Sequence, residues 1–278
     1  MTERALKPQE LAITVLGAYV RPNPQPVWSG GMVMVLGEFG FSQGAARVAL
    51  SRLVRRGLLG RVKEGRLVHY MLTPRSDHLL AEGDSRIFSL GWSDDWDGTW
   101  TILWQSIPES RRVDRSRLAR RLRFLGFGPV QDGTWISPHR REQEVLELVH
   151  ELDIAEHVGV ILGEPSRSLR IDRLIERAWD LGLLAKRYGR FVEDFSPYLD
   201  GPERSRLDEK QAFLVRTRLV HAFRQFPFLD PDLPDELMPE HAVRRRAAEI
   251  FHRVYEDLTE PAQRHFEEVA GPRTATTA

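Results

Sequence analysis

The N-terminal region is organised around one segment, Ser42-Gln-Gly-Ala-Ala-Arg-Val-Ala-Leu-Ser-Arg-Leu-Val-Arg-Arg56-Gly57. Serine is a favoured N-cap and glycine often follows a helix end, so the segment predicts a helix over residues 43–56. Apolar residues recur on one face at helical spacing: Ala46, Leu50, Leu53 and Val54. Polar residues lie on the opposite face: Gln43, Gly44, Arg47, Ser51 and Arg55. We expect the first face to pack against a core and the second to stay exposed.

Two helices are predicted before this segment. Residues 8–20 form an apolar helical pattern that begins with a proline, which suits a first turn. Three prolines within residues 22–26 exclude a helix there. Ser29 is a candidate N-cap for a short helix through residues 32–36, and Gly37-Glu-Phe-Gly40 is expected to form a turn.

Two strands are predicted within residues 58–72, with Lys63-Glu-Gly-Arg66 as the tip of a hairpin. Helix, helix, turn, helix and basic hairpin is the order of a winged helix-turn-helix, which we assign to residues 8–80. One helix of such a module enters the DNA major groove. We expect Arg47 and Gln43 to contact bases. Contacts to the DNA backbone are expected from five residues: Ser51, Arg52, Arg55, Lys63 and Arg66.

The distribution of charge favours this interpretation over one in which the arginines only solvate an amphipathic helix. Residues 1–80 contain eleven Lys or Arg and five Asp or Glu, a net charge of +6. Because the whole chain has a net charge of zero, residues 81–278 sum to −6. A basic N-terminal module on an acidic remainder suits a protein that presents one end to a polyanion.

The composition narrows the class of protein. A length of 278 residues is typical of two or three domains. The sequence contains no cysteine, which excludes disulfides, zinc-finger chemistry and a thiol nucleophile. We find neither a signal-peptide pattern nor a run of about 20 apolar residues. We therefore expect a cytoplasmic protein without a membrane segment, and no sequence motif indicates a cofactor.

Residues 95–165 predict a second domain, after a polar linker over residues 84–97. Apolar and aromatic patterns indicate a strand, a helix over residues 111–124, two short strands around Asp132-Gly133, another helix and a final strand. The order β-α-β-β-α-β is that of a ferredoxin-like domain. Seven arginines lie within residues 111–123, and we interpret this basic run as structural, paired with the acidic C-terminal module. The alternatives are phosphate contacts to DNA and binding of the anionic part of a CoA-type ligand.

Residues 168–268 predict an all-α domain with three helices, over 168–195, 207–226 and 242–259. The first is expected to break near Gly182 or Gly189. Aromatic and basic residues in this region suit a pocket for an aryl acyl thioester: Trp179, Tyr188, Arg218, His221 and Arg224. The alternative is that these aromatic residues belong to the core.

Several motifs together resemble the PaaX family of bacterial regulators, from about residue 8 to residue 265. The motifs are Ala18-Tyr-Val-Arg-Pro22, Ala45-Ala-Arg-Val-Ala-Leu-Ser-Arg-Leu53, Leu72-Thr-Pro74, Trp96-Asp-Gly-Thr-Trp100 and Leu125-Gly-Phe-Gly128. The resemblance implies DNA binding and repression of phenylacetate catabolism, with phenylacetyl-CoA as inducer. It also implies a Cas2-like fold for the central domain.

A Cas2-like domain raises the alternative of a metal-dependent nuclease. That chemistry requires acidic ligands that converge on one ion, usually at a strand end. The first strand of the central domain has no carboxylate, and we interpret Asp94, Asp95 and Asp97 as linker and turn residues. A scaffold or dimerisation role is favoured for this domain.

The sequence thus predicts an α+β multidomain protein, not an enzyme, that binds double-stranded DNA as a homodimer at an inverted repeat. We expect a repressor that an acyl-CoA such as phenylacetyl-CoA releases from its operator. A third possibility is a CoA-ester-binding module whose helix-turn-helix serves assembly, but the N-terminal charge of +6 argues against it.

Overall fold

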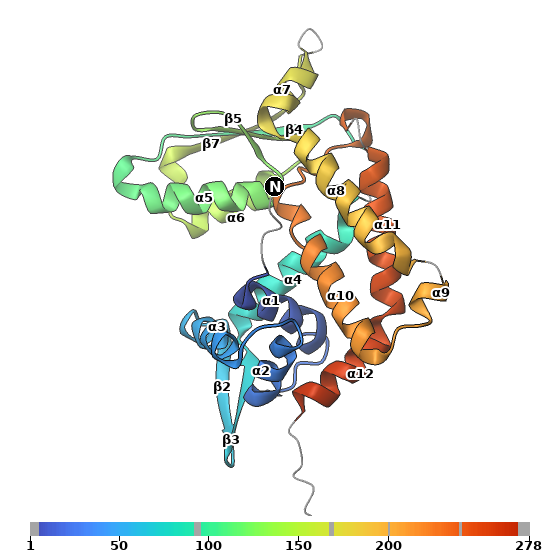
Figure 1. Cartoon of the computed structure of the whole chain (residues 1–278). Helices are drawn as coiled ribbons and strands as arrows, with labels where there is room; N and C mark the ends of the chain where they lie inside the picture. The colour runs from blue at the N-terminus through green and yellow to red at the C-terminus, as the bar shows by residue number, and fades with distance from the viewer. Residues whose placement is uncertain (1–5, 92–95, 167–169, 200, 239–240, 272–278) are drawn as a thin grey trace, which may run out of the picture. The chain divides into compact units, whose positions relative to one another are not determined.

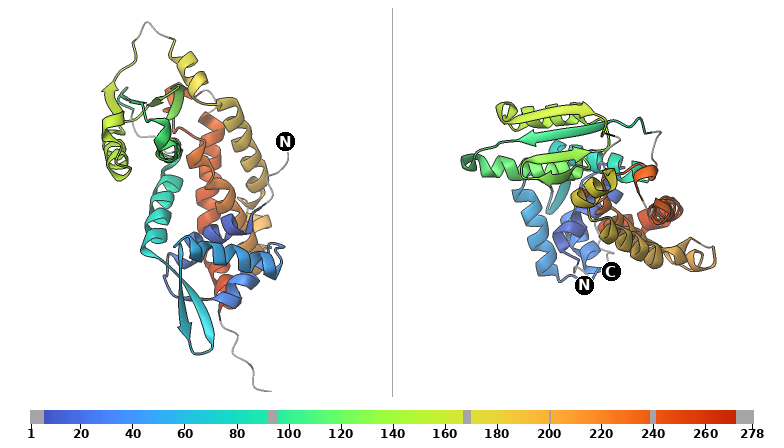
Figure 2. Two further views of the ribbon diagram at one scale, coloured as in Figure 1. Left: turned by 90° about the vertical axis from the view of Figure 1, so that its left-hand side faces the viewer. Right: turned by 90° about the horizontal axis from the view of Figure 1, so that it is seen from above.

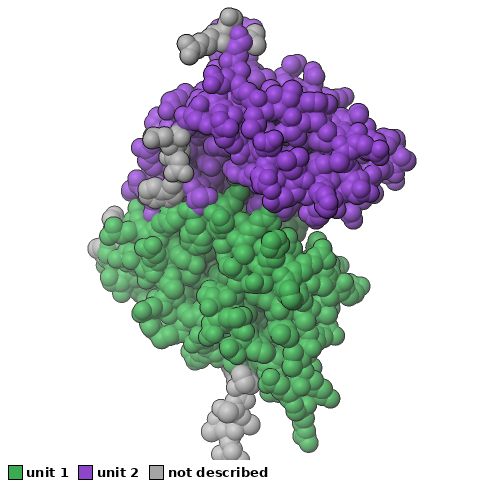
Figure 3. Space-filling view, turned by 180° about the vertical axis from the view of Figure 1, so that it is seen from behind, with its two compact units in different colours: residues 1–88, 195–224, 250–278 green, residues 89–194, 225–249 purple. Residues whose placement is uncertain are grey.

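The computed structural model describes residues 6–91, 96–166, 170–199, 201–238 and 241–271. The chain forms two compact units, which Figure 3 colours separately. Unit 1 contains Met1–Phe88, Phe195–Arg224 and Ile250–Ala278, and unit 2 contains Ser89–Asp194 and Gln225–Glu249. Among the described residues, no helix is long and apolar enough to cross a membrane.

Unit 1 begins with three helices and a small sheet (Figure 1). Its elements are α1 (Pro8–Val15), a π-helical turn (Leu16–Val20), β1 (Val27–Trp28), α2 (Ser29–Gly37), α3 (Gln43–Arg55), β2 (Leu59–Glu64), β3 (Leu67–Leu72) and α4 (Pro74–Ser89). The three strands are antiparallel, in the order β1-β3-β2. The helices and the hairpin lie where the sequence predicts them, whereas α4 occupies part of the predicted linker over residues 84–97.

Local signals explain most of these element ends. The Oγ of Ser42 accepts a hydrogen bond from the backbone N–H of Ala45 at 3.2 Å, so the predicted cap of α3 is confirmed. Gly57 and Gly65 have φ angles of +66° and +60°, which an L side chain rarely adopts. The predicted cap at Ser29 is wrong, because Ser29 is the first residue of α2 and the N-cap position is Trp28.

The core of unit 1 combines N- and C-terminal parts of the chain. Helices α10 (Glu209–Phe223), α11 (His241–Asp257) and α12 (Thr259–Ala270) follow the short helix α9 (Gly201–Arg204). Phe213 of α10 and Phe266 of α12 are buried with the apolar residues of α1, α2 and α3. The predicted three-domain division at 8–80, 95–165 and 168–268 stays a prediction.

Unit 2 contains a four-stranded antiparallel sheet in the order β5-β6-β4-β7. Its elements are β4 (Trp100–Gln105), α5 (Arg112–Phe124), β5 (Gly128–Gln131), β6 (Thr134–Ser137), α6 (Glu142–Glu151) and β7 (Val158–Gly163). The predicted order β-α-β-β-α-β is therefore confirmed. Helices α5 and α6 lie on the same face of the sheet, where Leu103 and Trp135 pack into a common core with Leu118 and Leu148 (Figure 1).

Two details of the predicted helices are wrong. Val113 was expected in the apolar stripe of α5, yet it is 58% exposed, because it lies in the first turn, away from the core residues Leu118 and Leu122. The predicted helix over residues 168–195 breaks at Trp179, between α7 (Ile171–Ala178) and α8 (Leu181–Phe195). Trp179 is extended there, with φ −140° and ψ 141°.

Gly128 of β5 lies directly against this break. A Cβ at Gly128 would lie 2.6 Å from the Trp179 ring and 2.8 Å from the carbonyl oxygen of Ala178. The missing side chain therefore allows the α7–α8 junction to pack directly on the strand. The glycines expected to break the helix, Gly182 and Gly189, instead lie within α8.

Gly128→Ala should lower the free energy of unfolding by about 1–3 kcal/mol, because a backbone carbonyl and a packed indole must both move. Urea unfolding of the full chain measures the change. Gly163→Ala is the matched control, since a Cβ at Gly163 meets no atom within 4 Å. Equal losses for the two variants would contradict this account of the junction.

Candidate functional site

The outer face of α3 presents the polar residues that the sequence singles out. Gln43, Arg47, Arg52 and Arg55 are exposed, and Ser51 is half-buried. Arg47 Nη2 donates to Gln43 Oε1 at 3.3 Å, so these two side chains meet near the helix N-terminus. Val48 is 50% exposed on the same part of α3. The sequence-based prediction did not include Val48, although an apolar residue within the polar face of a helix was a usable signal.

The hairpin of β2 and β3 adds a second group of exposed cations. Lys63 and Arg66 lie on either side of Gly65 at the tip, and both are exposed. Arg61, earlier on β2, is also exposed. The hairpin extends away from α1, α2 and α3 within unit 1 (Figure 2, left). Its tip therefore presents positive charge beyond the helices.

An ionic cluster holds the turn that leads into α3. Glu38, at the end of α2, accepts a hydrogen bond from His265 Nε2 of α12 at 2.9 Å, and Lys210 Nζ of α10 lies 3.4 Å from the other carboxylate oxygen. Glu38 and His265 are both largely buried. Because these partners are more than 170 residues from Glu38 in sequence, no local pattern predicts them. The C-terminal helices thus help to position α3.

The four residues predicted to bind a ligand are divided between the two units. Trp179 and Tyr188 belong to unit 2, and Arg218 and His221 belong to unit 1. Arg218 is exposed on α10. His221 is buried, and its Nδ1 lies 2.9 Å from Thr14 Oγ1. Burial, with the nearby Arg224 guanidinium, lowers the pKa of His221 to about 4, so it is neutral at pH 7.

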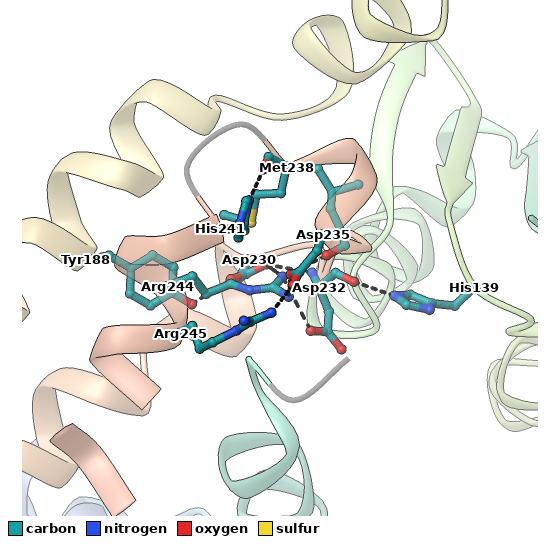
Figure 4. Close-up of polar contacts among 10 residues, drawn as sticks. His139, Tyr188, Asp230, Asp232, Asp235, Met238, His241, Arg244 and Arg245 are labelled. Carbon is teal, nitrogen blue, oxygen red and sulfur yellow. Dashed lines mark hydrogen bonds and ion pairs between the residues drawn. The ribbon is translucent and has the colours of Figure 1, made fainter. Parts of the chain in front are cut away.

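Tyr188 belongs to a buried ionic cluster, drawn in Figure 4. Its hydroxyl donates to Asp230 Oδ2 at 2.6 Å. The other Asp230 oxygen lies 3.7 Å from Arg244 Nη1 of α11, which also donates to the carbonyl of Leu233 at 2.9 Å. Burial raises the pKa of both Asp230 and Tyr188, so the tyrosine stays a donor. This geometry gives Tyr188 a structural role in unit 2.

The carboxylates considered for a nuclease site do not form a described cluster. Asp94 and Asp95 lie outside the described residues. Asp97 is exposed and accepts hydrogen bonds from Arg140 and from the Thr99 N–H, which lower its pKa to about 2. Across the described ranges, no group of three or more His, Asp or Glu is arranged to hold a metal ion.

Comparisons with known proteins match three successive parts of the chain. Family models match residues 7–76 ("PaaX-like protein"), 93–174 ("PaaX protein central Cas2-like domain") and 179–268 ("PaaX-like protein C-terminal domain"). The transcriptional repressor PaaX of Escherichia coli (strain K12) is 28% identical over 246 residues, which is 85% of this chain and 75% of the relative.

The solved structure of an uncharacterized protein from Mycobacterium tuberculosis shares the fold, with a TM-score of 0.57 and 22% identity over 92% of this chain and 96% of that one. The three family models together span most of the sequence, in the same order as its predicted modules. The chain therefore belongs to the PaaX-like protein family.

Proposed function

We propose that this protein is a DNA-binding transcriptional repressor, not an enzyme, and that residues 8–80 form a winged helix-turn-helix. The observation that supports it best is the pair of exposed basic features in unit 1, the outer face of α3 and the tip of the β2–β3 hairpin. The similarity to a transcriptional repressor of Escherichia coli supports the same function. We also propose that residues 168–268 form an all-α domain.

In this proposal the N-terminal half of α3 enters the major groove. Arg47 and Gln43 supply hydrogen bonds to base edges, and the exposed methyl groups of Val48 suit the methyl group of a thymine. The remaining contacts are to phosphates and position the module without reading sequence. They are assigned to Ser51, Arg52, Arg55, Lys63 and Arg66.

We also propose a cytoplasmic homodimer that binds an inverted repeat, because a twofold protein matches a twofold operator. The half-sites then lie about one helical turn, roughly 34–36 Å, or a multiple of it, apart. By its resemblance to the family, the protein would repress an aromatic-acid catabolic operon of the phenylacetate type, and an acyl-CoA such as phenylacetyl-CoA would release it from DNA.

Fluorescence anisotropy across a salt series tests this function. The DNA is taken from upstream of the protein's own gene, with a scrambled duplex of equal length as control. We expect tight, sequence-selective binding that phenylacetyl-CoA weakens. Selective binding that ignores the thioester would retain the repressor and reject this inducer. Equal affinity for both duplexes at every salt concentration would reject the function.

The double variant Lys63→Ala/Arg66→Ala should weaken binding to all DNA sequences and flatten the salt dependence. If each side chain neutralises one phosphate, the slope of log K against log salt should become less steep by about 1.8. The same anisotropy series measures it. A slope unchanged from the wild type would mean that the hairpin tip does not contact phosphate.

A further inference from the structure

Helix α5 carries a concentrated positive charge in a region that is otherwise acidic. Residues 112–124 contain six arginines, no lysine and a single acid, Asp114, which gives the helix a net charge of +5. Because residues 81–278 sum to −6, the rest of that range sums to −11. The charge of α5 is therefore a local feature and not a share of a generally basic surface.

Part of this basic run is engaged by the fold. Arg111, directly before α5, donates to the carbonyl oxygens of Leu152 and Asp153 at 3.0 and 2.7 Å, which ties the start of α5 to the end of α6. Two further arginines form ion pairs with nearby acids, Arg115 with Glu109 at 2.7 Å and Arg117 with Asp114 at 3.6 Å. None of these partners belongs to the acidic residues 168–268.

The other exposed arginines of α5 share one face of the helix. Arg112, Ser116, Arg120 and Arg123 follow one another at intervals of four, four and three residues, which places them on the same side. All four are exposed, on the side opposite the leucines that pack on the sheet. The three arginines form no ion pair with a described carboxylate. We call these four residues the arginine stripe.

The geometry of the arginine stripe suits a phosphate backbone. At 1.5 Å per residue it is about 16 Å long, the length of about five phosphates of one DNA strand. The Ser116 hydroxyl donates to the Arg112 carbonyl at 2.9 Å, so the middle of the stripe does not protrude. The Arg123 guanidinium lies 5.2 Å from the centre of the Trp135 ring, which limits its orientations. A guanidinium group can hold a phosphate through two hydrogen bonds.

The neighbouring helix α6 limits where a polyanion can lie. It packs on the same face of the sheet as α5 (Figure 1) and exposes Glu142, Glu147 and Glu151. In the described parts of the chain, none of these carboxylates forms an ion pair with the arginine stripe. A polyanion is attracted by α5 and repelled by α6, so it follows the stripe and does not cross to α6.

We propose that the arginine stripe of α5 is a second DNA-binding surface, which holds the phosphate backbone without reading base sequence. Arginines clustered along one face of a helix are the electrostatic footprint of a nucleic-acid-binding protein. The stripe adds affinity and salt dependence, whereas α3 supplies the sequence preference. The inference rests on the proposed function in one respect, that the polyanion is DNA.

The double variant Arg112→Ser/Arg120→Ser tests the surface by fluorescence anisotropy across a salt series. The duplex extends about two helical turns, roughly 70 Å, beyond both half-sites. If each side chain neutralises one phosphate, the slope of log K against log salt should become less steep by about 1.8 for each bound protomer. Affinity at low salt should fall by about tenfold or more, by the same factor for the operator and the scrambled duplex. A slope equal to that of the wild type would overturn the proposal.

Arg173→Ser/Arg177→Ser is the matched control. Both residues are exposed on α7 of unit 2, four positions apart, and their removal changes the net charge by the same amount. This variant should keep the wild-type slope. Equal flattening in the two variants would mean that net charge, and not the arginine stripe, determines the effect. Urea unfolding should give the wild-type midpoint for both, since all four side chains are exposed.

Photo-crosslinking shows whether DNA lies on the stripe itself. The sequence contains no cysteine, so Ser116→Cys provides a single attachment point for a benzophenone in the middle of the stripe. Gln143→Cys, at an exposed position of α6, is the control. We expect the probe at position 116 to crosslink to DNA and the probe at position 143 to crosslink far less. A yield at position 116 no higher than at position 143 would count against the surface.

The same measurements keep the two proposals separate. A wild type that binds the operator selectively, with an unchanged slope in Arg112→Ser/Arg120→Ser, rejects the arginine stripe and retains the repressor. A wild type that binds every duplex equally, with a flatter slope in that variant, retains the stripe and rejects the repressor. A wild type that binds no duplex at any salt concentration rejects both.

Discussion

Replacing Arg244 with methionine should lower the free energy of unfolding by about 3–5 kcal/mol, because it leaves buried acidic groups without their cation. Arg244 is only 1% exposed, and it lies within 3.7 Å of carboxylate oxygens of Asp230, Asp232 and Asp235. Asp230 is equally buried. Methionine keeps much of the side-chain volume, so the loss measures charge more than packing. Urea unfolding at pH 8 is the measurement.

The double variant Arg244→Met/Asp230→Asn is the matched control for this cluster. Asparagine keeps a carbonyl oxygen that can accept from Tyr188 but removes the buried negative charge. We expect the double variant to be more stable than Arg244→Met, because the uncompensated charge is gone. If Asp230→Asn lowers the free energy of unfolding as much in the Arg244→Met background as in the wild type, the pairing of Asp230 with Arg244 contributes little to stability.

The pH dependence of the Arg244→Met variant follows from Asp230. Burial raises the pKa of this carboxyl, and Arg244 opposes the rise, so removal of Arg244 raises that pKa further. A carboxyl whose pKa is higher in the folded state than in the unfolded state favours folding below its folded pKa and loses that contribution as pH rises through it. The loss of stability should therefore be smaller at pH 5 than at pH 8. Equal losses at both pH values would contradict the role of Asp230.

Features set by short stretches of sequence were predictable. The cap at Ser42, the buried positions Ala46, Leu50 and Leu53, and the glycine after α3 depend on neighbours within about four residues. The strands and helices of the central domain were predictable for the same reason. Their alternation of apolar and polar residues matches one face of a sheet or helix.

Features set by distant parts of the chain were not predictable. Local propensity placed the break in residues 168–195 at a glycine, whereas the chain breaks at Trp179, which packs on the distant Gly128. A local signal, the Asp180 side chain that accepts from the Leu183 N–H, lies beside the same break. Helix α12 was missed, and its close approach to α2, where Ala270 meets Gly31, joins residues 239 positions apart. The cluster of Tyr188, Asp230 and Arg244 likewise depends on three separate segments. A polar pattern in one segment does not specify its partner.

The proposed DNA contacts of unit 1 depend on both local sequence and tertiary contacts. Their positions on α3 and the hairpin follow from local sequence, and all of them are exposed in the structure except the half-buried Ser51. The turn before α3, however, contains Glu38, whose partners His265 and Lys210 come from distant helices. The sequence therefore predicts which residues face outward, while the contacts of the turn before α3 with the C-terminal helices come from the tertiary structure.

Arg47→Ala should weaken binding to the operator by about 5- to 150-fold, since one good contact between arginine and a guanine contributes about 1–3 kcal/mol of discrimination. The loss should be confined to one position in each half-site, where the base preference relaxes. Anisotropy measurements with operators substituted at single positions identify that position. Affinity for the scrambled duplex should change far less, because base contacts contribute little to nonspecific binding.

Arg253→Ala is the matched control for Arg47→Ala. Arg253 is exposed on the part of α11 that belongs to unit 1, and its removal changes the net charge by the same amount. It should leave both affinity and base preference unchanged. Arg47→Ala and Lys63→Ala/Arg66→Ala should have different effects. Arg47→Ala should alter sequence preference with little effect on the salt slope, whereas Lys63→Ala/Arg66→Ala should flatten the salt slope with little effect on sequence preference.

If Arg47→Ala weakens binding to all duplexes equally, Arg47 contacts phosphate. The assignment of α3 to base readout would then rest on Gln43 and Val48 alone.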